Sequence, residues 1–143
     1  MEALAETHPE CRFYKGTSYF RAKEYSSALD QWQALVDLQD IPKELEYLRV
    51  DAQNNLGFLY FMGWGVKQNK ERAIQQYWLP AEKAGHEEAA YHLCHTYAIE
   101  SPELALGYCR EALRRYDRIG RTDGDTNEII AQIRQLISWL EER

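Results

Sequence analysis

The sequence predicts an all-α fold of tandem antiparallel helix-turn-helix repeats with a C-terminal capping helix. The composition, 45% hydrophobic and 28% charged over 143 residues, is typical of a globular domain with a substantial core. Aromatic residues are plentiful while glycine and proline are scarce, which favours packed helices over a turn-rich β-sandwich. A set of three residues, spaced by four, recurs 37 positions later, and that spacing keeps each set on one helical face. The two sets are Ala52, Leu56 and Tyr60, and Ala89, Leu93 and Tyr97.

An earlier segment carries a related pattern of small and bulky residues. It consists of Gly16, Tyr19, Tyr25, Ala28, Trp32 and Leu35. Gly57, Tyr60, Ala73 and Tyr77 repeat its spacings within each helix, with a longer turn between the two helices. We expect the small residues to let the two helices of a pair cross closely, and the aromatics, Tyr19 with Trp32 and Tyr60 with Tyr77, to wedge between them.

Seven helices follow from these patterns and from their end signals. They are expected at 9–22, 25–39, 43–62, 69–84, 87–99, 102–117 and 126–142. The first six pair into units at 9–39, 43–84 and 87–117, and the last caps them, so residues 1–143 form a single repeat domain. The third helix is the longest, at about 20 residues or ~30 Å.

The ends of the central helices carry recognisable residues. Pro42 suits the start of the third helix, and Gly63-Trp64-Gly65 ends it, because glycine tolerates the positive φ of a C-cap. Asn69 is the expected N-cap of the fourth helix, and Pro80 should kink that helix. Gly85 is a further expected C-cap.

The last two helices have similar signals. Ser101-Pro102 predicts the start of the sixth helix, and Asp125 with Glu128 has the spacing of a capping box for the seventh. One apolar stripe then runs along the seventh helix, formed by Ile129, Ile133, Leu136, Ile137 and Leu140. The stripe predicts a capping helix; the alternative is a helix that binds a partner or dimerises.

These residues carry a family resemblance. Residues 16–35 look like one tetratricopeptide repeat (TPR), and residues 52–97 resemble the related Sel-one-like repeat. The Sel-one-like pattern is matched by Ala52, Leu56, Gly57, Tyr60, Gly63, Gly65, Val66, Ala73, Tyr77, Ala81 and Gly85. Together the resemblances cover roughly 9–117 and imply a short α-solenoid of about three units. The third unit departs from the pattern, because Cys94 replaces the usual glycine and the glycine-rich turn is missing after Tyr97.

Charge and segment composition weigh against several classes of protein. The net charge of −6 is unlike that of a protein that binds nucleic acid through phosphates. No apolar run approaches the ~20 residues that span a bilayer, so no membrane insertion is expected. Residues 1–10 lack the basic and apolar regions of a signal peptide, so we expect a cytoplasmic protein, or a periplasmic one if a leader has been removed.

The chain has three cysteines, Cys11, Cys94 and Cys109. A small, odd number of cysteines argues against a disulfide framework and suits a protein of a reducing compartment. Each is interpreted as a small buried hydrophobe. A single bridge between Cys94 and Cys109, on facing helices, is left open.

No catalytic motif is present, and we expect no enzyme activity and no cofactor. The best metal candidate is the group His92, Cys94 and His95, with His86 nearby. Cys94 points away from the face shared by the two histidines, and structural zinc usually needs four ligands in separated pairs. We therefore predict no metal site.

By analogy with TPR folds, the first helix of each pair lines a concave groove. The expected groove residues are Phe13, Thr17, Phe20 and Arg21 in unit one, Asn54, Phe58, Phe61 and Met62 in unit two, and Tyr91, His95, Ala98 and Ile99 in unit three. Such an aromatic and apolar groove suits an amphipathic helix or an extended peptide. Some of these aromatics have the alternative role of packing beneath a neighbouring repeat.

The functional hypothesis is a non-catalytic adaptor or scaffold that binds a protein or peptide. An immunity protein that masks a bacterial toxin or secreted effector is the first alternative, since an acidic surface suits a basic target. A metal-dependent factor or enzyme is the second. The sequence leaves the oligomeric state open.

Overall fold

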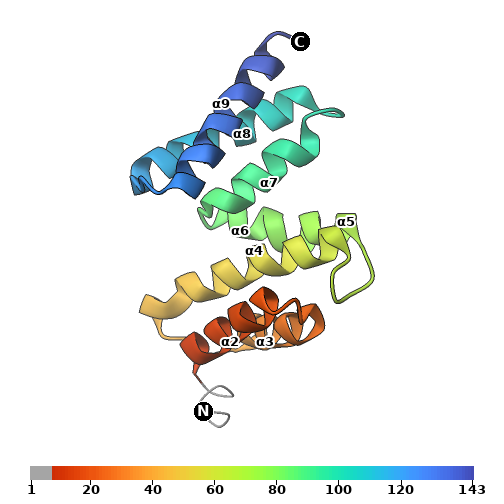
Figure 1. The fold of residues 1–143 in the computed structure, drawn as a ribbon, viewed down its shortest axis with the longest axis vertical. Coiled ribbons are helices and arrows are strands. Elements are labelled where there is room, and N and C mark those ends of the chain that lie inside the picture. The colour runs from red at the N-terminus through yellow and green to blue at the C-terminus, as the bar shows by residue number, and fades with distance from the viewer. Residues whose placement is uncertain (1–7) are drawn as a thin grey trace. The chain divides into compact units, whose positions relative to one another are not determined.

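The computed structural model describes residues 8–143, which form helices joined by short turns (Figure 1). Within that range there is no strand, which confirms the all-α class and the helical repeat fold. The chain divides into two compact units, Met1–Ala81 and Glu82–Arg143, which are described separately. The division falls inside the helix predicted at 69–84.

Helices of unit 1 follow the predicted order. They are α2 (Pro9–Arg21), α3 (Tyr25–Asp37), the 3₁₀ turn η1 (Lys43–Leu45), α4 (Glu46–Met62), α5 (Lys70–Arg72), the π-helix η2 (Ala73–Trp78) and the start of α6 (Leu79–Lys83). The helix predicted at 43–62 thus opens with a 3₁₀ turn directly after Pro42. Gly63, at φ 73°, ends α4 as expected, and its N–H donates to the Leu59 carbonyl.

Two close helix crossings organise the core of unit 1. A Cβ on Gly16 would lie 2.4 Å from Trp32 Nε1, and a Cβ on Gly57 would lie 2.3 Å from Trp78 Nε1. The small residues therefore permit close crossing, as the sequence predicts. Tyr60 stacks on Tyr77 with ring centroids 5.3 Å apart, also as predicted.

The helix predicted at 69–84 is irregular in its middle. Asn69 caps it, because its side chain accepts a hydrogen bond from the Arg72 N–H at 3.0 Å. Residues Ala73–Trp78 then form a π-helix, which ends two residues before Pro80, where a kink is expected. Proline has no N–H to offer the carbonyl four residues earlier, and a π-helical turn accommodates such a disruption by one extra residue.

Unit 2 consists of the end of α6 followed by α7 (Glu87–Tyr97), α8 (Pro102–Ile119) and α9 (Gly124–Glu141). The helix α8 packs against both α7 and α9. Small buried side chains recur along the contact between α7 and α8, and let these two helices approach closely. They are Ala90 and Cys94 on α7, Ala98 directly after it, and Ala105, Cys109 and Ala112 on α8.

The predicted apolar stripe of α9 covers this small-residue core, as expected of a capping helix. Ile133 and Leu140 are buried, and Ile129, Leu136 and Ile137 pack around them. The predicted start of the helix is wrong by two residues. Asp123, rather than the capping box of Asp125 and Glu128, caps α9 by accepting from the Thr126 N–H at 2.8 Å and the Thr126 Oγ1 at 2.9 Å.

The cysteines also require a correction. Cys94 and Cys109 are fully buried, as expected of small hydrophobes, but they form a disulfide between α7 and α8 with Cα atoms 4.8 Å apart. Cys11 is a free, half-buried thiol. The interpretation of the cysteines as unpaired side chains is therefore wrong for Cys94 and Cys109. The disulfide between them, which the sequence analysis left open, is formed.

Candidate functional site

The predicted groove residues of unit 1 contribute largely to one aromatic cluster. Phe20 and Phe58 lie 6.4 Å apart between ring centroids, and Trp64 packs on Phe58 at 5.4 Å and on Tyr25 at 4.9 Å. Trp64 lies in the loop after α4. The sequence predicts this loop only as the end of a helix, so the packing role of Trp64 was not predicted. All four rings are half-buried and pack against one another, so they hold α2, α3 and α4 together.

The other predicted residues of unit 1 are scattered. Thr17 and Phe13 belong to one turn of α2, where the Thr17 hydroxyl donates to the Phe13 carbonyl at 3.1 Å. Phe61 packs on Trp78 at 5.0 Å. Arg21 and Met62 are exposed at the ends of their helices, whereas Asn54 is only 2% exposed.

In unit 2, Tyr91 and His95 are brought together on α7. Their rings meet edge to face at 4.7 Å, and the Tyr91 hydroxyl donates to Gln132 Oε1 on α9 at 2.6 Å. Burial raises the pKa of Tyr91, with a smaller contribution from Glu88 and Glu128, so the phenol stays protonated and remains a donor at neutral pH. This hydrogen bond joins the two helices.

Beyond that bond, α7, the turn that follows it and α9 border a shallow, open apolar groove of about 480 Å³. It is lined by His95, Ala98, Ile99, Gln132, Gln135, Leu136 and Trp139. Ile99 is 71% exposed and Trp139 is 38% exposed, so both present apolar surface to solvent. Partial burial, and secondarily His92, lower the pKa of His95, so its imidazole is neutral at pH 7 and adds no charge to the groove.

Three of the seven lining residues, His95, Ala98 and Ile99, are among the expected groove residues. The sequence placed Tyr91, His95, Ala98 and Ile99 on a binding face. It missed the wall formed by α9, because that helix was interpreted as a cap and its apolar stripe was assigned to the core. One signal in the sequence could have revealed this wall. Trp139 lies outside the apolar stripe of α9, and it follows Gln135 by four residues and Gln132 by seven, so these three residues share a second face of the helix.

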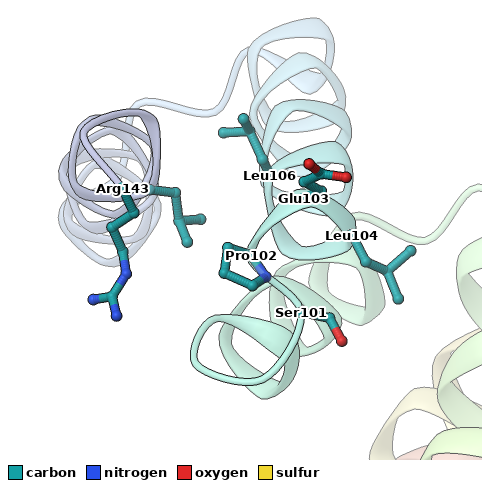
Figure 2. A pocket seen from close by; sticks show the side chains of 7 residues that line it. Ser101, Pro102, Glu103, Leu104, Leu106 and Arg143 are labelled. Atoms are coloured by element: carbon teal, nitrogen blue, oxygen red, sulfur yellow. The ribbon is translucent and has the colours of Figure 1, made fainter.

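A second pocket, of about 540 Å³, lies between the first turn of α8 and the end of α9. Figure 2 shows Pro102 and Leu106 on the side of α8 that faces α9, with Arg143 opposite and Leu104 directed away. Its charged residues, Glu103 and Arg143, have opposite signs, and none of the predicted groove residues takes part. We therefore assign the candidate site to the α7–α9 groove.

The histidine and cysteine group considered for a metal is engaged otherwise. Cys94 is disulfide-bonded, and His86 caps α7 by accepting from the Ala89 N–H at 3.2 Å. His92 Nε2 lies 3.3 Å from a Glu88 carboxylate oxygen. Across residues 8–143, no three His, Cys, Asp or Glu side chains are placed to share a metal ion.

Among the helices of the described chain, none has the length and apolar character needed to cross a bilayer.

Comparison with protein-family models, with curated proteins and with solved structures finds no match to this chain.

Proposed function

We propose that this chain is a non-catalytic protein-binding module of TPR-like helix pairs, and that it holds a segment of a partner protein in the α7–α9 groove. The observation that carries the proposal is the pair of exposed apolar side chains, Ile99 and Trp139, on opposite walls of one groove. Apolar side chains left exposed to solvent on one continuous surface are typical of interaction sites.

The composition of the groove also supports a peptide ligand. A partly exposed tryptophan buries a large area on binding at a small cost in side-chain entropy, which is why tryptophan is common among binding hot spots. Gln132 and Gln135 offer amide donors and acceptors beside the apolar floor. This combination suits apolar side chains for affinity and a few polar contacts for orientation.

The proposal is tested by selecting binders from a displayed library of random peptides of about 12 residues, the length of three helical turns. Affinities of the selected peptides are then measured by fluorescence anisotropy for the wild type and for Trp139→Ala and Ile99→Ser. Each substitution should weaken binding by about tenfold or more, as expected for a hot-spot residue.

Matched controls are Leu104→Ser and Tyr47→Ser, which also remove exposed apolar side chains but lie outside the groove. They should leave affinity unchanged. Because Ile99 is exposed, Ile99→Ser should change the free energy of unfolding by no more than about 0.5 kcal/mol. Failure to select any peptide, or equal binding by wild type and groove variants, would rule out the groove as a peptide site.

A further inference from the structure

The α7–α9 groove has an asymmetric charge distribution along its length. Glu88 lies one helical turn before Tyr91, and Glu128 lies one turn before Gln132. The Tyr91–Gln132 hydrogen bond fixes these two turns beside each other. Two carboxylates from different helices therefore flank the same end of the groove, while the apolar residues Ile99 and Trp139 occupy the other end.

The remaining charges near the Glu88 end strengthen this asymmetry. Glu87 precedes Glu88 on α7, and the exposed Asp125 lies three residues before Glu128 on α9. The cations on this side are Arg121, in the turn before α9, and Arg115, which donates to the His86 carbonyl and is paired with Glu82 and Glu111. At the opposite end the Arg143 guanidinium lies over the Trp139 ring, 4.1 Å from its centroid. The groove thus runs from a carboxylate-rich end to an apolar end with an arginine.

Electrostatic effects on nearby tyrosines agree with this placement. Burial raises the pKa of Tyr116, and the next largest contributions come from Glu88 and Glu87. Both carboxylates are therefore close enough to act on the same part of unit 2. The Glu88 side chain is 44% exposed, with His92 Nε2 3.3 Å from one of its carboxylate oxygens.

We propose that the occupant of the groove is an amphipathic helix of a partner protein, with apolar residues along one face and lysine or arginine at the end that meets Glu88 and Glu128. This inference rests on the proposed function and adds the chemical class of the partner. Glu88 lies in the first turn of α7 and Ile99 in the turn that follows the helix, so a partner helix of about three turns spans the groove. Its basic end would form ion pairs with the two carboxylates, and its apolar face would cover Ile99 and Trp139.

The experiment uses the same random peptide library, selected in parallel on the full-length wild type and on the double variant Glu88→Gln/Glu128→Gln. Wild-type selections should be enriched in apolar residues spaced by three and four, with lysine or arginine at one end. The double variant should lose the basic preference while keeping the apolar one. For a given basic peptide, its affinity should fall by about fivefold, the effect of two exposed ion pairs.

The control is Glu44→Gln/Glu103→Gln, which removes two exposed carboxylates outside the groove and should leave the selection unchanged. Exchange of lysine for glutamate in a selected peptide should weaken binding to the wild type more than to the groove double variant. If the peptides selected on the wild type are apolar, depend on Trp139 and show no enrichment of lysine or arginine, this inference is wrong but the proposed function stands. Absence of any peptide that depends on Trp139 would overturn both.

Discussion

Trp32 and Trp78 make the same contact in two successive helix pairs. The indole Nε1 of Trp32 donates to the Phe13 carbonyl at 3.3 Å, and that of Trp78 donates to the Asn54 carbonyl at 3.1 Å. Each acceptor lies three residues before a glycine that the indole covers. We call this arrangement the Gly–Trp crossing; it fixes both the distance and the register of the two helices.

The third helix pair replaces the Gly–Trp crossing with a covalent one. Cys94 follows Leu93 as Gly57 follows Leu56 in the recurring pattern, and it is bonded to Cys109 on α8. The indole of a Gly–Trp crossing fills the space where a Cβ would lie, so it could not pack in the same way against a cysteine. The cysteine sulfur instead bonds directly to the facing helix. The two solutions satisfy the same requirement, namely a close approach of two helices at one point.

Substitution of Gly57 by alanine should destabilise unit 1. The added Cβ would lie 2.3 Å from Trp78 Nε1, and the indole cannot move away without losing its hydrogen bond to Asn54. Overpacking of this kind typically costs about 1–3 kcal/mol. Chemical unfolding followed by tryptophan fluorescence measures the change.

Gly107→Ala is the matched control, since a Cβ at this exposed position in α8 would have no neighbour within 4 Å. Relief of the glycine penalty in a helix interior should stabilise the protein by about 0.5–1 kcal/mol. Opposite signs for the two glycine-to-alanine changes are the expected outcome. A neutral or stabilising Gly57→Ala would mean that the indole does not hold this crossing.

Reduction of the Cys94–Cys109 disulfide should destabilise unit 2. The bridge joins residues 15 apart in sequence, and closing a loop of that length contributes about 3 kcal/mol in the chain-entropy model. Denaturant unfolding with and without dithiothreitol measures the difference. The double variant Cys94→Ala/Cys109→Ala should behave like the reduced wild type and should not respond to the reductant, whereas Cys11→Ser should respond as the wild type does. Equal stability of the oxidised and reduced wild type would contradict a structural role for the bridge.

Helix pairs were predictable from the sequence because small and bulky residues recur with spacings that only a helix places on one face. The details at the crossings were not. The second pair offers two adjacent aromatics, Tyr77 and Trp78, and the repeat pattern favours the first because it follows Ala73 by four, as Trp32 follows Ala28. The π-helix inserts one residue, so Trp78 covers the glycine and Tyr77 stacks on Tyr60 instead.

The candidate site was predictable from one side only. Its α7 side was expected from the resemblance to TPR folds, which predicts a groove position for His95 in the third unit. The α9 wall depends on how far the last helix is rotated against α8, and the apolar stripe alone does not specify that rotation. The choice of cap was ambiguous in a similar way, because Asp123 and Asp125 both precede Thr126 and only Asp123 receives both donors of Thr126.

Arg115 should contribute strongly to unit 2. Its guanidinium is mostly buried and donates to the His86 carbonyl at 3.1 Å, to Glu82 at 2.7 Å and to Glu111 at 3.1 Å. Arg115→Gln should cost about 2 kcal/mol, because two carboxylates and a carbonyl lose a charged donor. Arg114→Gln is the control: this side chain pairs with Glu111 at an exposed position, and its loss should cost less than about 0.5 kcal/mol. Thermal unfolding of both variants would show whether the two arginines differ, and equal losses would contradict the buried network.

The N-cap of α9 should make unit 2 sensitive to acid. The Thr126 N–H and hydroxyl hold the pKa of the Asp123 carboxyl below its ordinary value of 3.8, because both stabilise the charged form. A depressed folded-state pKa contributes stability that is fully present above the ordinary pKa and is lost as the pH falls through the folded value. Asp123→Asn keeps a capping acceptor but cannot titrate, so the variant should lose less helicity than the wild type when acidified below pH 3.8. Circular dichroism between neutral and acidic pH measures the loss of helicity. Asp125→Asn is the control, since it removes an exposed acid that is not the cap. Identical acid transitions in the wild type and Asp123→Asn would show that another carboxyl controls the loss of helicity in acid.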